Sequence, residues 1–260
     1  MPKDDSNYRG RIAPSPTGLL HEGNIATFKL AFNRCKEMGG TLILRNEDID
    51  RNRSDFKYWQ FIEKQLDRLG IFFQESPCIG GPHNPYQQSL SFSHYKKAMV
   101  VLNKLGLIYP CVYSRREINN FLPKCLGSNQ EIVFPVSLRP CPKVSFAMNW
   151  NVNWRFRVPD STPINFTDQA MGETQWLTER DFGDFLVWRK DGTPSYELAV
   201  VVDDARMQVT EVVRGADLLL STGRQILLYN ALKCRIPLFY HCPIVKDQFG
   251  KKLSKRNQVL

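Results

Sequence analysis

The sequence has no long hydrophobic run. Its longest apolar stretch, YELAVVV at residues 196–202, is far too short to span a bilayer. The first ten residues lack the apolar segment of a secretory signal. These absences predict a cytoplasmic protein without a membrane partner.

Internal repeats, low-complexity tracts and a disulfide framework are also missing. The seven cysteines are odd in number and scattered over 260 residues, which favours free thiols. The content of 42% hydrophobic and 23% charged residues is typical of a globular protein. The net charge of +9 favours a polyanionic partner, nucleic acid first, although a solvated basic surface explains the charge equally well.

Short buried strands alternate with amphipathic helices in much of the chain. The first two strands are GRIA, at residues 10–13, and TLILRNED, at residues 41–48. The helices predicted from apolar spacing span residues 23–40, 54–70 and 87–106. This alternation predicts an α/β fold with a Rossmann-like, doubly wound and mostly parallel sheet.

Further elements continue this alternation toward the end of the chain. SYELAVVVDD, at residues 195–204, is predicted to be a strand, and TGRQILLYNALKC a helix capped by Thr222 and Gly223. Ser54 is the predicted cap of the helix over residues 54–70.

Residues 109–181 interrupt the alternation with cysteines, prolines and short mixed segments. We interpret them as an inserted α+β subdomain between two halves of the α/β domain, residues 1–108 and 182–260. The apolar residues expected to form the core of this insertion are Ile132, Val133, Phe134, Phe146 and Trp154.

The stretch PTGLLHEGN, at residues 16–24, combines glycines with a histidine just after the first strand. Gly18 and Gly23 allow the backbone to approach a ligand closely, and a helix that starts near Gly23 or Asn24 directs N–H groups toward it. His21 adds a hydrogen-bond donor, although a histidine at this position is more often a helix cap.

A second motif, KKLSK at residues 251–255, places lysines around a serine after a glycine. Lysine clusters are usually solvated surface, but this one, together with HEGN, predicts the two halves of a phosphate clamp. The pair resembles the HIGH and KMSKS signatures of class I aminoacyl-tRNA synthetases.

The resemblance extends from about residue 9 to the end of the sequence. The segments RIAPSPTGLLHEGN, LILRNEDID, GPHNPYQQS, GDFLVWRKDGTPSYELAVVVDD, EVVRGADLLLSTGRQILLYNAL and GKKLSKRN resemble the catalytic core of glutamyl-tRNA synthetases. RGADLL and KLSKRN resemble the short glutamyl-queuosine tRNA(Asp) synthetases within that group. The resemblance implies a chain without an anticodon-binding domain.

A glutamate pocket needs an anion for the ammonium group and a guanidinium for a carboxylate. Glu47 is the candidate anion, and Arg11, with Ser15 beside it, is the candidate for the side-chain carboxylate. Tyr196 and Arg214 match the remaining glutamate contacts of the family. The competing interpretation is that Arg11 and Glu47 form an ion pair that joins two strands.

The resemblance implies a reaction in two steps. The glutamate α-carboxylate attacks the α-phosphorus of ATP, and an RNA hydroxyl then attacks the adenylate. His21, Gly18, Gly23 and Asn24 would hold ATP from one side, and Lys252 and Lys255 from the other, with Mg²⁺ shared among the phosphates. Lys255 best matches the family's ATP contact, and we expect a monomer.

Relatives often carry zinc in the insertion, bound by Cys-x-Cys followed by a tyrosine and a cysteine. Here Cys111 and Cys141 remain, but Tyr113 stands at the second cysteine, and the tyrosine position falls near Phe134 or Ser137. Even with Cys125 recruited, too few ligands remain for a tetrahedral structural site. We therefore expect no zinc.

Two alternatives stay open. One is the catalytic part of an ordinary glutamyl-tRNA synthetase, which charges glutamate tRNA. The other is a non-catalytic RNA-binding relative, against which the joint presence of the candidate residues argues.

Overall fold

The computed structural model describes residues 8–121, 133–141 and 144–243. Its centre is a set of short parallel strands, in which β1 pairs with β2 and β8 with β9. Their bounds are Arg9–Ile12 (β1), Thr41–Leu44 (β2), Glu211–Gly215 (β8) and Leu238–Cys242 (β9). The predicted strands over 10–13 and 41–48 correspond to β1 and β2.

A backbone hydrogen bond joins the two strand pairs. The N–H of Thr210, just before β8, donates to the carbonyl of Arg9 in β1 at 2.9 Å. The strand order is therefore β2–β1–β8–β9. From β1 the chain continues to β2 on one side, whereas β8 and β9 lie on the other side, so the strand order reverses between β1 and β8. In doubly wound folds such a reversal opens a crevice at the carboxyl ends of the strands, where ligands bind.

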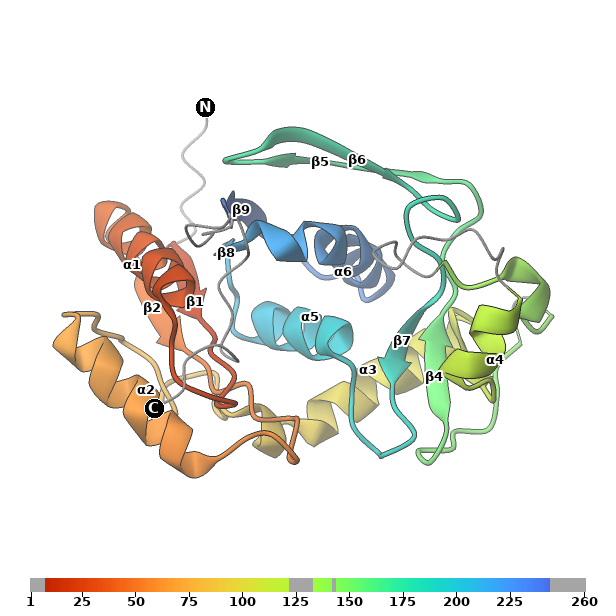
Figure 1. Cartoon of the computed structure of the whole chain (residues 1–260), viewed down its shortest axis with the longest axis horizontal. Helices are drawn as coiled ribbons and strands as arrows, with labels where there is room; N and C mark the ends of the chain where they lie inside the picture. Colours follow the sequence, from red (N-terminus) through yellow and green to blue (C-terminus); the bar gives the residue numbers. More distant parts are fainter. Residues whose placement is uncertain (1–7, 122–132, 142–143, 244–260) are drawn as a thin grey trace.

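The longer helices surround these strands (Figure 1). Their bounds are Glu22–Glu37 (α1), Phe56–Arg68 (α2), Phe92–Lys104 (α3), Tyr196–Arg206 (α5) and Leu219–Ala231 (α6). The first three confirm the helices predicted from apolar spacing. Ser54 does not cap α2, because Asp55 is the N-cap and its carboxylate accepts the Lys57 N–H at 2.8 Å.

Residues 196–204 form helix α5, so the prediction of a strand was wrong. Ser195 is the N-cap of α5, and its hydroxyl accepts the Leu198 N–H at 3.3 Å. Leu198, Ala199, Val200 and Val201 are all buried, because α5 lies between α3, α6 and β7. A helix that other elements cover on all sides needs no polar face. Its apolar residues are therefore consecutive and do not recur with the helical period that sequence prediction relies on.

The predicted cap of α6 was also wrong. The helix begins earlier, at Leu219, with Leu218 at the N-cap and no capping side chain. Thr222 and Gly223 lie inside it and are buried.

The described part of the segment between α3 and α5 adds antiparallel strands and the short helix α4. The three-stranded sheet has the order β3–β4–β7, and the hairpin β5–β6 extends the central strands because β5 pairs with β9. The bounds are Ile108–Cys111 (β3), Arg115–Asn120 (α4), Asn153–Phe156 (β4), Pro163–Asp168 (β5), Gly172–Leu177 (β6) and Phe185–Trp188 (β7). Short 3₁₀ turns cover Gln88–Leu90, Val136–Leu138 and Ala216–Leu218. Figure 1 shows β4, β7 and α4 at one end of the molecule and α1 and α2 at the other, with α5 and α6 between them.

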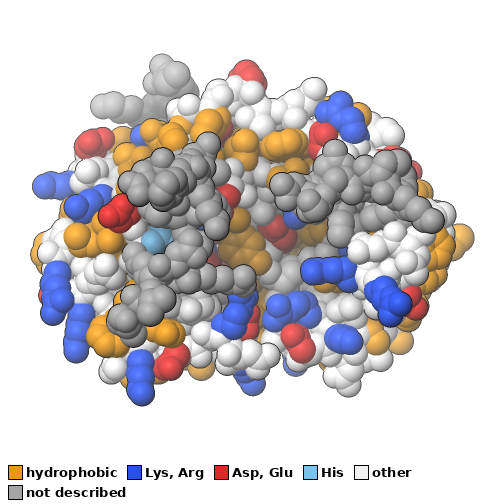
Figure 2. Space-filling model, in the orientation of Figure 1, with side chains coloured by type: hydrophobic (Ala, Val, Ile, Leu, Met, Phe, Trp, Pro, Cys, Tyr) orange, Lys and Arg blue, Asp and Glu red, His pale blue; other side chains and the backbone are white. Residues whose placement is uncertain are grey.

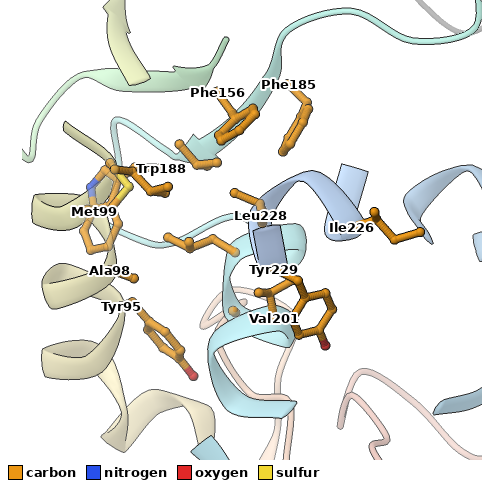
Figure 3. Close-up of a cluster of buried hydrophobic side chains, with 14 of the residues drawn as sticks. Tyr95, Ala98, Met99, Phe156, Phe185, Trp188, Val201, Ile226, Leu228 and Tyr229 are labelled. Atoms are coloured by element: carbon orange, nitrogen blue, oxygen red, sulfur yellow. The ribbon is translucent and has the colours of Figure 1, made fainter. Parts of the chain in front are cut away.

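One large hydrophobic core crosses the predicted domain boundaries (Figure 3). Tyr95 and Met99 of α3 pack in the same cluster as Trp188 of β7, Val201 of α5 and Leu228 of α6. The sheet β3–β4–β7 likewise joins β4, from within residues 109–181, to β7, from beyond residue 181. The division at residues 108 and 181 stays an interpretation.

The expected core of the insertion is partly visible. Phe134 and Trp154 are buried, and Phe146 packs against both the main core and the cluster around Phe134. Val133 is half-buried, whereas Ile132 lies outside the described residues. In the part of the chain that the structure describes, no helix is both long and apolar enough to cross a bilayer.

Replacing Ser195 with alanine should lower the free energy of unfolding by about 0.5–2 kcal/mol, because α5 loses its N-cap acceptor. Ser195→Thr keeps a hydroxyl and is expected to stay close to wild type. Chemical denaturation of the three proteins measures both effects. Equal stability of the alanine and threonine variants would contradict the assignment of Ser195 as the cap.

Candidate functional site

A cavity of about 350 Å³ opens where the strand order reverses. Its walls come from the carboxyl ends of β1 and β8, the start of α1 and the first residue of α5. The predicted site residues that line it are Arg11, Ser15, His21, Gly23, Asn24, Glu47, Tyr196 and Arg214. The fold therefore brings together residues that are spread over two hundred positions of the sequence.

Gly18, also predicted to hold ATP, lies in the loop between β1 and α1 and does not line the cavity. Lys252 and Lys255 lie outside the described residues.

His21 is the N-cap of α1, which starts one residue earlier than the predicted Gly23. Its Nδ1 accepts the N–H of Asn24 at 3.3 Å, and the Asn24 side chain accepts the His21 N–H at 3.4 Å. Because Nδ1 acts as an acceptor, the proton of the neutral ring is on Nε2. The capping role therefore leaves the ring in the tautomer whose Nε2 is a donor.

Glu47 follows β2 and is buried beside Arg45. The Arg45 guanidinium donates to Glu47 Oε1 at 3.0 Å and also bonds the carboxylate of Asp204. Backbone bonds hold this region against β1, since Arg45 N donates to Ile12 O at 2.9 Å and Glu47 N to Pro14 O at 3.2 Å.

The predicted alternative of an Arg11–Glu47 ion pair does not occur. The carboxylate that pairs with Arg11 is that of Asp204, with 3.6 Å between Nε and Oδ1. The sequence analysis missed both Arg45 and Asp204, although each lies inside a quoted motif. The only signal was their position, directly after TLIL and within VVDD.

The two carboxylates beside Arg45 differ in their pKa. Burial raises the pKa of Glu47 above its ordinary value, and the charges of Arg45 and Arg11 offset only part of this effect. Burial also raises the pKa of Asp204, but Arg45 and Arg11 outweigh it and lower this pKa below the usual value. Asp204 thus carries the negative charge that balances the arginines, and a cation beside Glu47 would favour its ionised form.

Arg11 and Arg214 present two buried guanidinium groups to the cavity. Arg11 Nη1 donates to the carbonyl of Val213 at 3.1 Å, and Arg214 Nη2 donates to the Thr222 hydroxyl at 2.8 Å. Within the described residues, Arg214 Nη1 has no hydrogen-bond partner, whereas Arg11 Nε lies 3.6 Å from Asp204 Oδ1. A buried donor without a partner is costly, so the site is suited to an anion that satisfies Arg214 Nη1.

A histidine and an aspartate, also missed by the sequence analysis, lie next to Arg214. Arg214 Nε donates to His241 Nε2 at 3.1 Å, and His241 Nδ1 lies 2.6 Å from Asp168 Oδ2. Burial, together with the charge of Arg214, lowers the pKa of His241 to about 4, although Asp168 opposes the shift. The ring is therefore neutral at neutral pH.

A second cavity of about 650 Å³ shares Tyr196 with the first. Arg115, Arg155 and Arg224 line it together with aromatic side chains, among them Tyr113 and Phe134. Asp184 and Glu197 also line it.

The candidate zinc remnant does not form a cluster in the described part of the chain. Cys111 is buried with its Sγ 3.3 Å from Arg155 Nε, whereas Cys141 is exposed, and Cys125 lies outside the described residues. Among residues 8–121, 133–141 and 144–243 there is no group of three or more His, Cys, Asp or Glu that could hold a metal. The absence of zinc stays a prediction.

Residues 7–260 match the family model described as tRNA synthetases class I (E and Q), catalytic domain. The chain belongs to this synthetase family. The predicted α/β, Rossmann-like catalytic fold is thereby confirmed, and the synthetase is an ATP-dependent ligase.

Two similar proteins carry the name glutamyl-Q tRNA(Asp) synthetase. The one from Nitratidesulfovibrio vulgaris is 39% identical, over 97% of this chain and 79% of its own length. The one from Symbiobacterium thermophilum is 41% identical, over 95% and 78%. The predicted resemblance to this group is therefore confirmed.

A similar solved structure is the glutamate-tRNA synthetase of Elizabethkingia anophelis. It has a TM-score of 0.80 and 29% identity, over 96% of this chain. The synthetase spans about half of that longer chain, 53%.

The contribution of His241 to the free energy of unfolding should fall as the pH drops from about 6.5 to about 4. In the folded protein the pKa of His241 is about 4, below the ordinary value, so the unfolded chain binds more protons in this interval. Glutamine at position 241 cannot titrate, so the stability advantage of wild type over His241→Gln should narrow on acidification. Denaturant unfolding at several pH values measures this difference, and a constant difference would contradict a neutral buried His241.

Proposed function

We propose that this synthetase activates L-glutamate with ATP and transfers it to the queuosine base in the anticodon of aspartate tRNA. The observation that carries the proposal is the cavity that combines Glu47 with the guanidinium groups of Arg11 and Arg214. The proposed RNA substrate is taken from the names of the two similar glutamyl-Q tRNA(Asp) synthetases. We expect the enzyme to act as a monomer in the cytoplasm.

Glutamate has one ammonium and two carboxylates, which match the charges of the cavity. Glu47 is proposed to bind the ammonium, and Arg11, with Ser15, the side-chain carboxylate. Tyr196 and Arg214 then contact the rest of the amino acid, which keeps its α-carboxylate close to the ATP site. Glutamine would leave a buried guanidinium under-satisfied, at a cost of about 1.5–3 kcal/mol.

Activation needs no side-chain nucleophile. The α-carboxylate attacks the α-phosphorus of ATP and pyrophosphate leaves, so positioning and charge neutralisation provide the acceleration. His21 Nε2 and the amino end of α1 are proposed to bind phosphate oxygens from one side, and Lys252 and Lys255 to approach from the other side. Mg²⁺ prefers phosphate and water oxygens, and bound to ATP it would neutralise charge on the phosphates.

The second cavity is proposed to receive the acceptor nucleoside. It adjoins the glutamate site through Tyr196 and combines arginines with aromatic rings, the groups that bind phosphates and stack on bases. Figure 2 shows Lys and Arg side chains along the left and lower edges of one face, in keeping with the net charge of +9. An RNA hydroxyl placed there attacks the adenylate carbonyl and AMP leaves.

Glutamate-dependent exchange of labelled pyrophosphate into ATP should proceed without tRNA, because the pocket residues all lie on the catalytic core. Arg11→Gln should lower kcat/KM for glutamate on the order of a hundredfold, the scale for leaving a buried charge unpaired. Arg53→Gln, which removes an exposed arginine paired with Asp50, is the matched control and should behave as wild type. Exchange that appears only after tRNA is added would instead favour an ordinary glutamate–tRNA ligase.

The RNA substrate is tested separately, by transfer of labelled glutamate to purified tRNAs. Aspartate tRNA with queuosine should be labelled, and the same tRNA without the modified base should not. Labelling of glutamate tRNA at its 3′ end would refute the queuosine proposal and support the ordinary ligase. Binding of tRNA without either reaction would support the non-catalytic alternative.

A further inference from the structure

The end of the β5–β6 hairpin reaches the strand that follows α6. Asp168, the last residue of β5, pairs with Phe239 of β9, and Gln169 N donates to the Phe239 carbonyl at 2.8 Å. The hairpin belongs to the predicted insertion, whereas β9 belongs to the central strands. Asp168 is thus fixed where the two parts meet.

The two oxygens of the Asp168 carboxylate have different partners. Oδ1 accepts three backbone N–H groups, from His241 at 3.2 Å, Ala170 at 3.0 Å and Met171 at 2.9 Å. Oδ2 lies 2.6 Å from His241 Nδ1. Although burial raises the pKa of Asp168, these hydrogen bonds lower it below its ordinary value, so the carboxylate stays charged.

A charged acceptor at Nδ1 fixes the tautomer of His241. The neutral ring places its proton on Nδ1, and Nε2 becomes an acceptor. Nε2 lies 3.1 Å from Arg214 Nε, which donates to it, and 3.1 Å from the Thr222 hydroxyl. Thr222 in turn accepts from Arg214 Nη2 at 2.8 Å.

We propose that Asp168 and His241 are positioning residues that hold the guanidinium plane of Arg214 for the bound glutamate. This inference rests on the proposed function, which assigns Arg214 to the glutamate site. Two of the three guanidinium nitrogens are held by His241 and Thr222, so the planar group cannot rotate. Nη1 is the nitrogen without a partner among the described residues, and Arg214 lines the cavity.

The surroundings of His241 support a ring that acts as an acceptor. The charged groups that influence it are Asp168 from β5, Arg214 from β8 and Arg11 from β1. Two of these groups are arginines. A second proton would make the ring a cation next to them, and the repulsion between like charges disfavours that form. An apolar side chain could fill the same space, but it could not accept a hydrogen bond from Arg214 Nε. Through this chain of contacts, the hairpin determines how the glutamate site is arranged.

Asp168→Asn tests the proposal. The amide introduced by this substitution can keep its carbonyl oxygen on the backbone N–H groups, but its NH₂ then faces Nδ1 of His241, which must become an acceptor. The ring proton moves to Nε2 and opposes the Arg214 Nε–H. We expect KM for glutamate to rise about 10- to 100-fold in pyrophosphate exchange, with KM for ATP changed less than about twofold.

Glu173→Gln is the matched control. It removes a carboxylate from the same hairpin, where Glu173 accepts from the Thr167 hydroxyl on the exposed face. This variant should keep both KM values. Equal increases in both values for Asp168→Asn would indicate a general structural defect and overturn the positioning role.

A second pair of variants covers the case in which Asp168→Asn does not fold. His241→Gln retains an oxygen that can accept from Arg214 Nε, whereas His241→Leu has no acceptor. The leucine variant should show the rise in KM for glutamate. The glutamine variant should have a KM between those of the leucine variant and wild type. If both variants bind glutamate equally well, His241 does not position Arg214.

The outcome also separates this inference from the proposed function. A wild-type enzyme that exchanges pyrophosphate with glutamate, together with an Asp168→Asn variant of unchanged KM, overturns the inference alone. A wild-type enzyme that shows no glutamate-dependent exchange and no thermal stabilisation by glutamate overturns the proposed function, and the inference with it.

Discussion

The guanidinium of Arg45 is completely buried and joins Glu47, after β2, to Asp204 in α5. A charge removed from water in this way is stable only while its partners remain in place, since loss of one partner costs about 3–5 kcal/mol. Arg45 therefore fixes the distance between the end of β2 and α5. Because Glu47 and Tyr196 belong to these two segments, the walls of the cavity depend on the same ion pairs.

Residues 109–181, the predicted insertion, share both a core and a polar contact with the rest of the described chain. Trp154 and Phe185 of the antiparallel sheet pack in the same cluster as Leu198 of α5. At the other end, Asp168 of the hairpin bonds His241 of β9. The predicted insertion is consequently not a loosely attached module, and its position is tied to that of the strands around the proposed amino-acid site.

Local signals explain what the sequence could predict. The spacing of apolar residues before Gly39 and Gly70 identified α1 and α2. The charges of glutamate and the family resemblance together selected Arg11, Glu47 and Arg214, which line one cavity. Helix α5 was mistaken for a strand because burial on all sides removes the polar face that reveals a helix. The pairs Arg45–Asp204 and Asp168–His241 join residues 159 and 73 positions apart, and no local pattern encodes such a contact.

Tyr196 begins α5 and lines both cavities, with 40% of its surface exposed. In our proposal the amino acid and the acceptor nucleoside therefore both contact this one side chain. If either ligand changes the orientation of this ring, it changes the affinity of the other, and thermodynamic reciprocity makes the two effects equal in size. In the proposed enzyme, a single tyrosine thus couples binding of the first substrate to the affinity for the second.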